Sequence, residues 1–198
     1  MTEGLLLIDK PEGVSSFSLI PKLRKIYNIK KIGHAGTLDP LATGLMIYLV
    51  GRAYTKQSDV FLGLDKVYTV RAQLGVISDS YDINGVIQSV AHPLPSESDL
   101  VDTIMSFQGG YEQEPPMYSA LKHQGQPLYK YARKGVDIER KKRSVRLNIS
   151  NIHVTNDHYS FTVECSSGTY IRSLIHDIGQ KLSCGSIVVE LRRISIGS

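Results

Sequence analysis

The sequence alternates between short apolar runs and amphipathic stretches, and this pattern predicts a mixture of strands and helices. Residues 4–8 and 45–50 are almost continuously apolar, which is typical of buried strands. In residues 65–74 apolar and polar positions alternate, as expected for a half-buried strand. Asn156-Asp157 supplies a turn between two further strands. The remaining strands are expected at residues 145–154, 159–165 and 186–196.

Helices are expected where apolar residues recur every three or four positions. Such stretches cover residues 51–61, 96–107 and 168–182, and another ends at about Tyr27. Ser15 or Ser16 is expected to cap this first helix. Its apolar face would then consist of Phe17, Ile20, Leu23 and Tyr27. Together the elements predict an α/β (α+β) fold with a mainly antiparallel mixed sheet flanked by helices, in a single domain covering residues 1–198.

A glycine-rich stretch, residues 33–44, leads directly into the apolar run at 45–50 and contains a single carboxylate, Asp39. Gly33 and Gly36 permit a tight backbone path, and Pro40 keeps Asp39 out of the helical region. One interpretation is an ordinary Asp-Pro turn, in which the carboxylate caps nearby backbone N–H groups. The other is a reactive carboxylate held at a rigid point of the chain.

Composition narrows the class of protein. The chain has 198 residues, of which 41% are hydrophobic and 21% charged, as in an ordinary globular protein. No apolar run has the length needed to span a bilayer, and the N-terminus has no basic leader. The two cysteines form no metal-binding or disulfide pattern, so we expect a reducing cytoplasm.

The spacing of Asp79, Asp82 and Asn84 loosely resembles a calcium-binding loop. The terminal glutamate that such a loop needs is missing, so we reject a metal site there.

Positive charge is concentrated in two clusters, although the formal net charge is only +4. The first precedes the Asp39 loop and contains Lys22, Arg24, Lys25, Lys30 and Lys31. The second lies mostly within residues 109–143, where tyrosines are interleaved with the cations. Such a pattern forms either a solvated basic loop or a surface that binds RNA by stacking and phosphate contacts. We interpret residues 109–143 as an RNA-gripping insertion.

Four motifs together resemble the TruB family of pseudouridine synthases. The stretch Gly33-His34-Ala35-Gly36-Thr37-Leu38-Asp39-Pro40-Leu41-Ala42-Thr43-Gly44 is similar to the central motif of that family. Lys10-Pro11 with Gly13 and Ser15 is similar to its N-terminal motif. The segments Lys66-Val67-Tyr68 and Ser166 to Arg172 follow in the family's order and spacing. The resemblance covers nearly the whole chain, although the family's usual C-terminal RNA-binding extension has no counterpart here.

The resemblance implies three catalytic residues. Asp39 corresponds to the family's catalytic aspartate, and Arg172 is the expected ion-pair partner of its carboxylate. Without the resemblance, Arg172 would be interpreted as a surface arginine in the first turn of a helix. Tyr68 corresponds to a tyrosine that stacks on the target base and is a candidate for proton removal at C5; the alternative for a tyrosine on a strand is packing in the core. Asp39 has three possible roles: attack at C6, attack at C1′, or removal of a sugar proton.

Further residues are implied to contact RNA. His34 corresponds to the histidine that inserts near the flipped base, and Leu191 to a leucine beside the pocket. Lys10 corresponds to a lysine that supports the active site, the alternative being an exposed lysine in a strand-to-helix turn. In the insertion, the segments that resemble the family's RNA-gripping loop contain Tyr118, Lys122, Lys130 and Arg133.

The activity implied by the resemblance is isomerisation of the T-loop uridine of tRNA, position 55 in standard tRNA numbering, to pseudouridine. This reaction needs no cofactor or metal, and the sequence contains no P-loop, dinucleotide fingerprint or metal-ligand cluster. We expect a monomer that binds the T-arm of tRNA and neither a membrane nor a nucleotide cofactor. Two alternatives are an RNA-binding or RNA-folding module without catalysis, and a guide-dependent relative that acts on other RNA.

Overall fold

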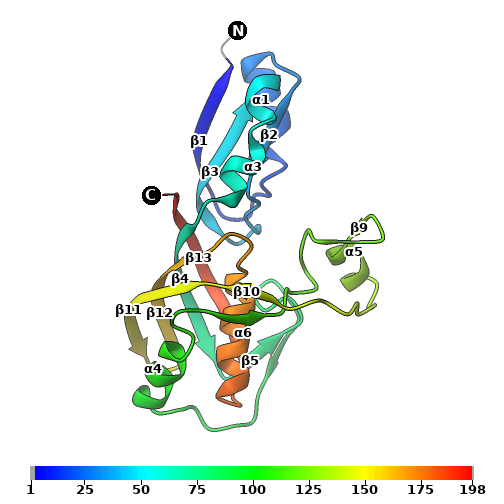
Figure 1. Ribbon diagram of the computed structural model, residues 1–198. Helices are drawn as coiled ribbons and strands as arrows, with labels where there is room; N and C mark the ends of the chain where they lie inside the picture. Colours follow the sequence, from blue (N-terminus) through cyan, green and yellow to red (C-terminus); the bar gives the residue numbers. More distant parts are fainter. Residues whose placement is uncertain (1–2, 198) are drawn as a thin grey trace. The chain divides into compact units, whose positions relative to one another are not determined.

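The structure, a computed structural model, describes residues 3–197 and contains a mixed set of strands and helices (Figure 1). Within these residues the chain forms two compact units. Unit 1 contains residues 3–69, 162–167 and 190–197, and unit 2 contains residues 70–161 and 168–189. Three strands contribute residues to both units: β4 (Lys66–Leu74), β12 (His158–Cys165) and β13 (Ser186–Ile196).

A seven-stranded sheet has the order β1-β3-β13-β4-β12-β11, with β2 also pairing with β3. In unit 1, β1 and β2 both run antiparallel to β3, and β13 runs parallel to it. The register places Leu7 opposite Ile47, and Arg193 opposite Gly44. The elements of this unit are β1 (Gly4–Lys10), α1 (Leu19–Tyr27), β2 (Ile32–Ala35), β3 (Thr43–Val50), α2 (Arg52–Thr55) and α3 (Ser58–Gly63).

Unit 1 buries one face of β3 beneath short helices. Ala35, Ile47 and Leu49 form a buried cluster, against which Tyr54 of α2 and Phe61 of α3 pack. Burial of this apolar surface holds β2 and β3 together, and the loop between these two strands carries Asp39. The core of unit 1 therefore anchors both ends of that loop.

Unit 2 is built around α6 (Ile171–Lys181), whose apolar stripe is buried. Ile171, Leu174, Ile175 and Ile178 are each at most 4% exposed, as the helical spacing predicted. Helix α4 contributes Leu100 and Ile104 to the buried core. The other elements are β5 (Val76–Ser78), β6 (Ile87–Ser89), α4 (Glu97–Met105), β7 (Tyr111–Gln113), β8 (Lys122–His123), β9 (Gln126–Pro127), α5 (Leu128–Ala132), β10 (Arg143–Val145) and β11 (Leu147–Thr155).

The expected fold class and all of the expected long strands are confirmed, but two helical predictions need correction. The first helix begins only at Leu19, so Phe17 precedes it and is 67% exposed. The helix expected at residues 51–61 is instead two short helices, α2 and α3. Periodicity alone does not locate such breaks, because tertiary contacts decide where the backbone leaves the helical region.

None of the described helices combines the length and the apolar character that crossing a membrane requires.

Gly44 lets two strands approach closely, which leads to a first prediction. Its φ is +102°, and a Cβ atom added there would collide with the backbone carbonyl oxygen of Arg193. We expect Gly44→Ala to lower the free energy of unfolding by about 2–4 kcal/mol, because both the backbone conformation and the β3–β13 pairing are disturbed. Urea unfolding measures this. Gly63→Ala is the control, since a Cβ there meets no atom within 4 Å; equal losses in the two variants would contradict the prediction.

Candidate active site

Asp39 lies in unit 1, in the loop between β2 and β3, and its side chain is partly exposed. The residues on either side of it are anchored. Leu38 and Leu41 are each 4% exposed, and the N–H of Ala42 donates to the carbonyl oxygen of Asp39 at 3.1 Å. Gly36 opens the loop with a φ of +85°. The carboxylate therefore projects from a backbone that its neighbours hold in place.

Ser16 holds the residue immediately before Asp39. The N–H of Leu38 donates to Ser16 Oγ, and the Ser16 hydroxyl contacts the Leu38 carbonyl oxygen, each at 2.9 Å. Tyr48 donates its hydroxyl to the Ser16 carbonyl oxygen at 2.7 Å. Ser16 is 1% exposed and does not cap α1, contrary to our expectation. Sequence reasoning missed this role because the partner lies 22 residues away along the chain.

Lys10 holds the residue immediately after Asp39. Its ammonium group is buried and donates to the carbonyl oxygens of Pro11, Val14 and Pro40, at 2.9, 2.7 and 3.2 Å. Burial lowers the pKa of this lysine, and the negative charge of Asp39 opposes that effect. A second bond to the Pro40 carbonyl comes from the N–H of Gly13, at 2.8 Å. Lys10 is thus placed to support the loop, and the alternative of an exposed lysine is wrong.

Tyr68 and Leu191 are the other buried members of the predicted site in unit 1, on β4 and β13. They are 8% and 7% exposed. Burial raises the pKa of Tyr68, the adjacent Arg193 guanidinium opposes this rise, and the charge of Asp39 adds to it. Tyr68 therefore stays a neutral phenol at neutral pH. Because the charge of Asp39 affects the pKa of Tyr68, these two candidate residues are electrostatic neighbours within unit 1.

His34 lies on β2 and is partly exposed, with its ring edge-to-face against Tyr48 at a centroid distance of 6.0 Å. Burial lowers its pKa, and the positive charge of Arg193 lowers it further. The imidazole is therefore neutral at neutral pH. A neutral, partly exposed ring is suited to stacking.

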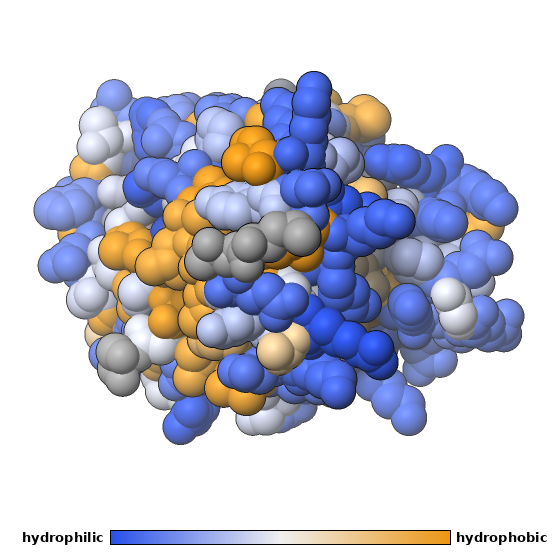
Figure 2. Space-filling view, turned by 90° about the horizontal axis from the view of Figure 1, so that it is seen from above, coloured by the Kyte–Doolittle hydropathy of each residue, from blue (hydrophilic) through white to orange (hydrophobic). Residues whose placement is uncertain are grey.

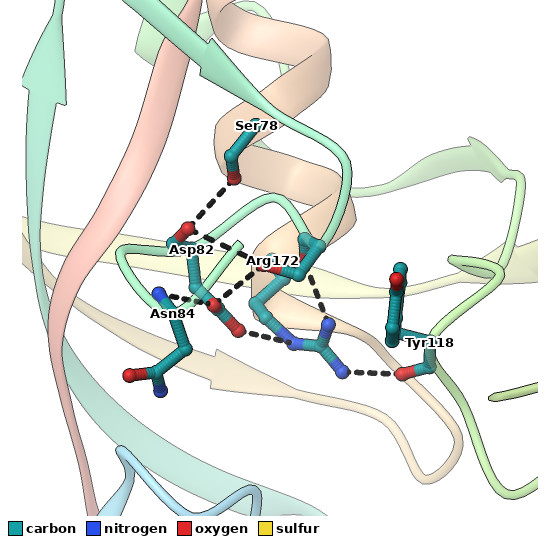
Figure 3. Close-up of polar contacts among 6 residues, drawn as sticks. Ser78, Asp82, Asn84, Tyr118 and Arg172 are labelled. Carbon is teal, nitrogen blue, oxygen red and sulfur yellow. Dashed lines mark hydrogen bonds and ion pairs between the residues drawn. The ribbon is translucent and has the colours of Figure 1, made fainter. Parts of the chain in front are cut away.

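Arg172 lies in unit 2, in the first turn of α6, and is 3% exposed (Figure 3). Its Nη1 donates to the carbonyl oxygen of Ser80 and its Nη2 to that of Tyr118, each at 2.7 Å. Its Nε lies 3.6 Å from Asp82 Oδ2. Arg172 is therefore not a surface arginine. The predicted pairing with Asp39 stays a prediction, because Asp39 belongs to unit 1.

Asp82 is a residue whose role sequence reasoning missed. Its carboxylate accepts from the Ser80 hydroxyl at 2.7 Å and from the N–H of Asn84 at 3.0 Å, and its other oxygen faces Arg172 (Figure 3). Ser78 donates its hydroxyl to the Asp82 carbonyl oxygen at 2.7 Å. The signal was available, since a cation in the first turn of a helix needs a carboxylate partner. The sequence does not show which aspartate folds back onto α6.

The predicted RNA-binding residues of the insertion lie in unit 2. Lys122, Lys130 and Arg133 are exposed, and the Arg133 guanidinium lies over the ring of Tyr129 at 5.4 Å. Tyr118 is partly exposed and donates its hydroxyl to Asp79 Oδ2 at 3.0 Å. Hydrophilic side chains dominate much of the face seen in Figure 2, including its right-hand part, while apolar side chains gather in one area of that face. The insertion thus presents exposed cations, one of which lies over an aromatic ring.

Comparisons with known proteins converge on one family. Residues 24–171 match the family described as "TruB family pseudouridylate synthase (N terminal domain)". The tRNA pseudouridine synthase B of Chlamydia abortus is 48% identical over 198 residues, which cover 84% of that protein. The protein of the same name from Blochmanniella pennsylvanica is 50% identical over 195 residues and 75% of its length.

Solved structures agree with this assignment. A chain of a Cbf5-Nop10-Gar1 complex superposes with a TM-score of 0.74 and 29% identity, covering 98% of this chain. A chain from an H/ACA RNP bound to a substrate RNA gives a TM-score of 0.70 at 26% identity. The present chain spans about half the length of each, 49% and 47%.

The Ser16 contacts lead to a second prediction. Replacing Ser16 with alanine leaves the buried N–H and carbonyl groups of Leu38 without their hydroxyl partner, which costs about 1–3 kcal/mol of unfolding free energy. Chemical denaturation of Ser16→Ala measures this loss. Ser18→Ala is the matched control, because the Ser18 hydroxyl bonds only within an exposed turn. A loss no larger than that of the control would contradict the proposed anchoring.

The lowered pKa of His34 leads to a prediction on pH. Its pKa in the folded chain lies below the ordinary value of 6.5. As the pH falls below that value, the unfolded chain binds a proton that the folded chain resists, so stability falls toward acid. Replacing His34 with glutamine removes this contribution, so stability should decline less between about pH 7 and about pH 5. Urea unfolding at both pH values tests this, with the exposed His92→Gln as control; parallel declines in the wild type and His34→Gln would contradict it.

Proposed function

The chain belongs to the TruB family of pseudouridylate synthases and is therefore an isomerase; from this premise we propose that it converts the T-loop uridine of tRNA, position 55, to pseudouridine. The relatives named as tRNA pseudouridine synthase B match over 98% or more of this chain and support tRNA as the substrate. We propose further that it acts in the cytoplasm, as a monomer that binds the T-arm.

The observation that carries this proposal is the placement of Asp39 in unit 1. The carboxylate is partly exposed on a loop whose two flanking residues are bonded to the buried side chains of Ser16 and Lys10. It also interacts electrostatically with Tyr68. A carboxylate held in this way does not have to be ordered when the substrate binds. Such fixed orientation of a reacting group lowers the entropic part of the activation barrier.

The reaction breaks the N1–C1′ bond of uridine and joins C5 of the same base to C1′. The hydrogen on C5 leaves and N1 takes up a proton, so atoms and electrons balance without an added reagent. A carboxylate oxygen can act as a nucleophile or accept a proton. Asp39 is accordingly proposed as the nucleophile or base. Tyr68 is proposed to stack on the uracil ring. Because a neutral phenol is a very weak base, Tyr68 can take the C5 proton only as it gives up its own hydroxyl proton, which balances the proton that N1 takes up.

Arg172 is proposed as the cationic partner of the reacting carboxylate. Two backbone carbonyl oxygens fix its guanidinium, and Asp82 balances part of its charge. A positive charge beside Asp39 would keep that carboxylate ionised when RNA covers it.

The target uridine is stacked in its loop, so we propose that it is flipped out at a cost of about a few kcal/mol. Stacking of His34 in the vacated space would return about 1–3 kcal/mol. The exposed cations Lys122, Lys130 and Arg133 would neutralise phosphates. Binding is then expected to weaken steeply with salt.

A guide-dependent activity is the second candidate, and the structural neighbours favour it, since two belong to a Cbf5-Nop10-Gar1 complex and an H/ACA RNP. Those chains are 29% and 26% identical, whereas the tRNA enzymes reach 48% and 50%. We therefore favour the stand-alone activity on tRNA. Conversion of an unmodified T-arm hairpin by the purified chain alone separates the two.

Replacing Asp39 with asparagine tests the chemistry. We expect isomerisation to fall by more than about a thousandfold, because the side chain can neither attack nor accept a proton. Affinity for the hairpin should remain, since Asp39 supplies no phosphate contact. Pseudouridine formation and filter binding measure the two effects.

Asp9→Asn is the matched control. Asp9 is an exposed aspartate of unit 1, paired with Arg192 at 2.7 Å, and its loss should leave the rate nearly unchanged. Unchanged activity of Asp39→Asn would exclude Asp39 as the reacting group. An inactive wild type that still binds the hairpin would instead favour the RNA-binding module without catalysis.

A further inference from the structure

Arg193 is a buried cation in unit 1 to which the proposed mechanism gives no role. It lies on β13, is 1% exposed, and is among the largest fully buried side chains. Its neighbour Arg192 is exposed and pairs with Asp9. Burying a guanidinium is costly unless its N–H groups are bonded, so the contacts that Arg193 makes indicate what it stabilises.

These contacts join the two ends of the loop that carries Asp39. Nε donates to the Leu45 carbonyl oxygen at 2.7 Å, and Nη2 contacts the Gly36 carbonyl oxygen at 3.1 Å and Met46 Sδ at 3.0 Å. Gly36 precedes Asp39 by three residues, and Leu45 follows it by six. One planar group therefore fixes the start and the end of the loop at once.

The approach of Arg193 to this loop requires glycine at two positions. A Cβ on Gly36 would lie 3.3 Å from Arg193 Nη1, and one on Gly44 would collide with the Arg193 backbone. Both glycines also have positive φ values. The loop therefore packs closely against Arg193. A side chain of a different shape at this position would not bond to both the Leu45 and the Gly36 carbonyl oxygens.

The same guanidinium acts on Tyr68 and His34 through its charge. It opposes the rise that burial causes in the pKa of Tyr68, and it adds to the fall that burial causes in the pKa of His34. Arg193 therefore holds the loop and is also an electrostatic neighbour of two candidate residues.

We propose that Arg193 is a positioning residue that holds both ends of the Asp39 loop, and so sets the position of the Asp39 carboxylate for the chemical step. The inference deepens the proposed function and rests on it. Arg193 touches no reacting atom in this scheme. It acts through Asp39, and its loss affects the rate of isomerisation rather than the binding of RNA.

The first experiment separates chemistry from binding in Arg193→Met and Arg193→Lys. Lysine keeps the charge but cannot donate in two directions from a planar fork. With saturating T-arm hairpin we expect both variants to lose about a hundredfold in single-turnover rate, while the Kd for the hairpin changes by less than about threefold. Arg192→Met is the matched control and should keep its rate. A weaker Kd with an unchanged rate constant would overturn the inference.

A double-mutant cycle distinguishes positioning from a general loss of structure. If Arg193 acts by holding the Asp39 loop, the rate loss of Arg193→Met should be smaller in a Ser16→Ala background, in which the same loop has already lost a contact, than in the wild type. Rates are compared well below each variant's melting temperature. Losses that multiply independently would overturn the action of Arg193 on the loop. Recovery of the full rate on cooling would reduce Arg193 to a structural residue, and would also overturn it.

The wild type provides a measurement that needs no substitution to fold. With arginine labelled at Nε and methionine at its methyl group, the Met46 signal is identified by its absence in Met46→Leu. We expect a slowly exchanging Arg193 Nε–H and nuclear Overhauser contacts from the guanidinium to the Met46 methyl group, because Nη2 lies 3.0 Å from Met46 Sδ. A freely rotating guanidinium, or no contact, would overturn the inference even if the variants aggregate. If the wild type converts no uridine, the proposed function fails, and this measurement still decides whether Arg193 holds the loop.

Discussion

The candidate site depends on one constraint: a loop with a glycine-rich backbone cannot satisfy its own polar groups when it is buried on both sides of Asp39. Three buried side chains meet this need, namely Lys10, Ser16 and Arg193, each at most 1% exposed. They bond to backbone groups of Pro40, Leu38 and Gly36. Because an unpaired buried amide or carbonyl is costly, these contacts favour one path of the chain and one position for the carboxylate between them.

Buried cations in this protein bond mainly to carbonyl oxygens. Arg172 follows this rule in unit 2, as Lys10 and Arg193 do in unit 1, although Arg172 also has Asp82. Carbonyl oxygens carry only partial charges, so the positive field of such a cation still reaches neighbouring groups. In unit 1 that field acts on Tyr68 and His34, whose pKa values the Arg193 charge lowers. A field of this kind is suited to a reaction that develops negative charge on a uracil ring.

Burial and exposure divide the predicted residues into two groups. Asp39 and His34 are partly exposed, and Lys122, Lys130 and Arg133 are exposed, as the proposed contacts with RNA require. Lys10, Tyr68, Arg172 and Leu191 are buried and contact the chain itself. The motif that resembles a family thus combines residues of two kinds. Some are exposed and are the candidates for contact with a substrate, and others are buried and hold the loops that carry the exposed ones. The motif alone does not distinguish the two kinds.

The sequence by itself determined the fold class, every long strand and the buried stripe of α6, because periodicity acts over a few neighbouring residues. Asp39 was singled out only because its motif resembles a family, since local chemistry alone left an ordinary turn open. The sequence did not determine the start of α1, the role of Ser16, the partnership of Asp82 with Arg172, or the burial of Arg193. The last three join segments 22 or more residues apart, by 22 for Ser16 and Leu38 and by 157 for Arg193 and Gly36. Only the packed chain decides which polar groups meet over such separations, since the hydrogen bonds form where burial removes water as an alternative partner.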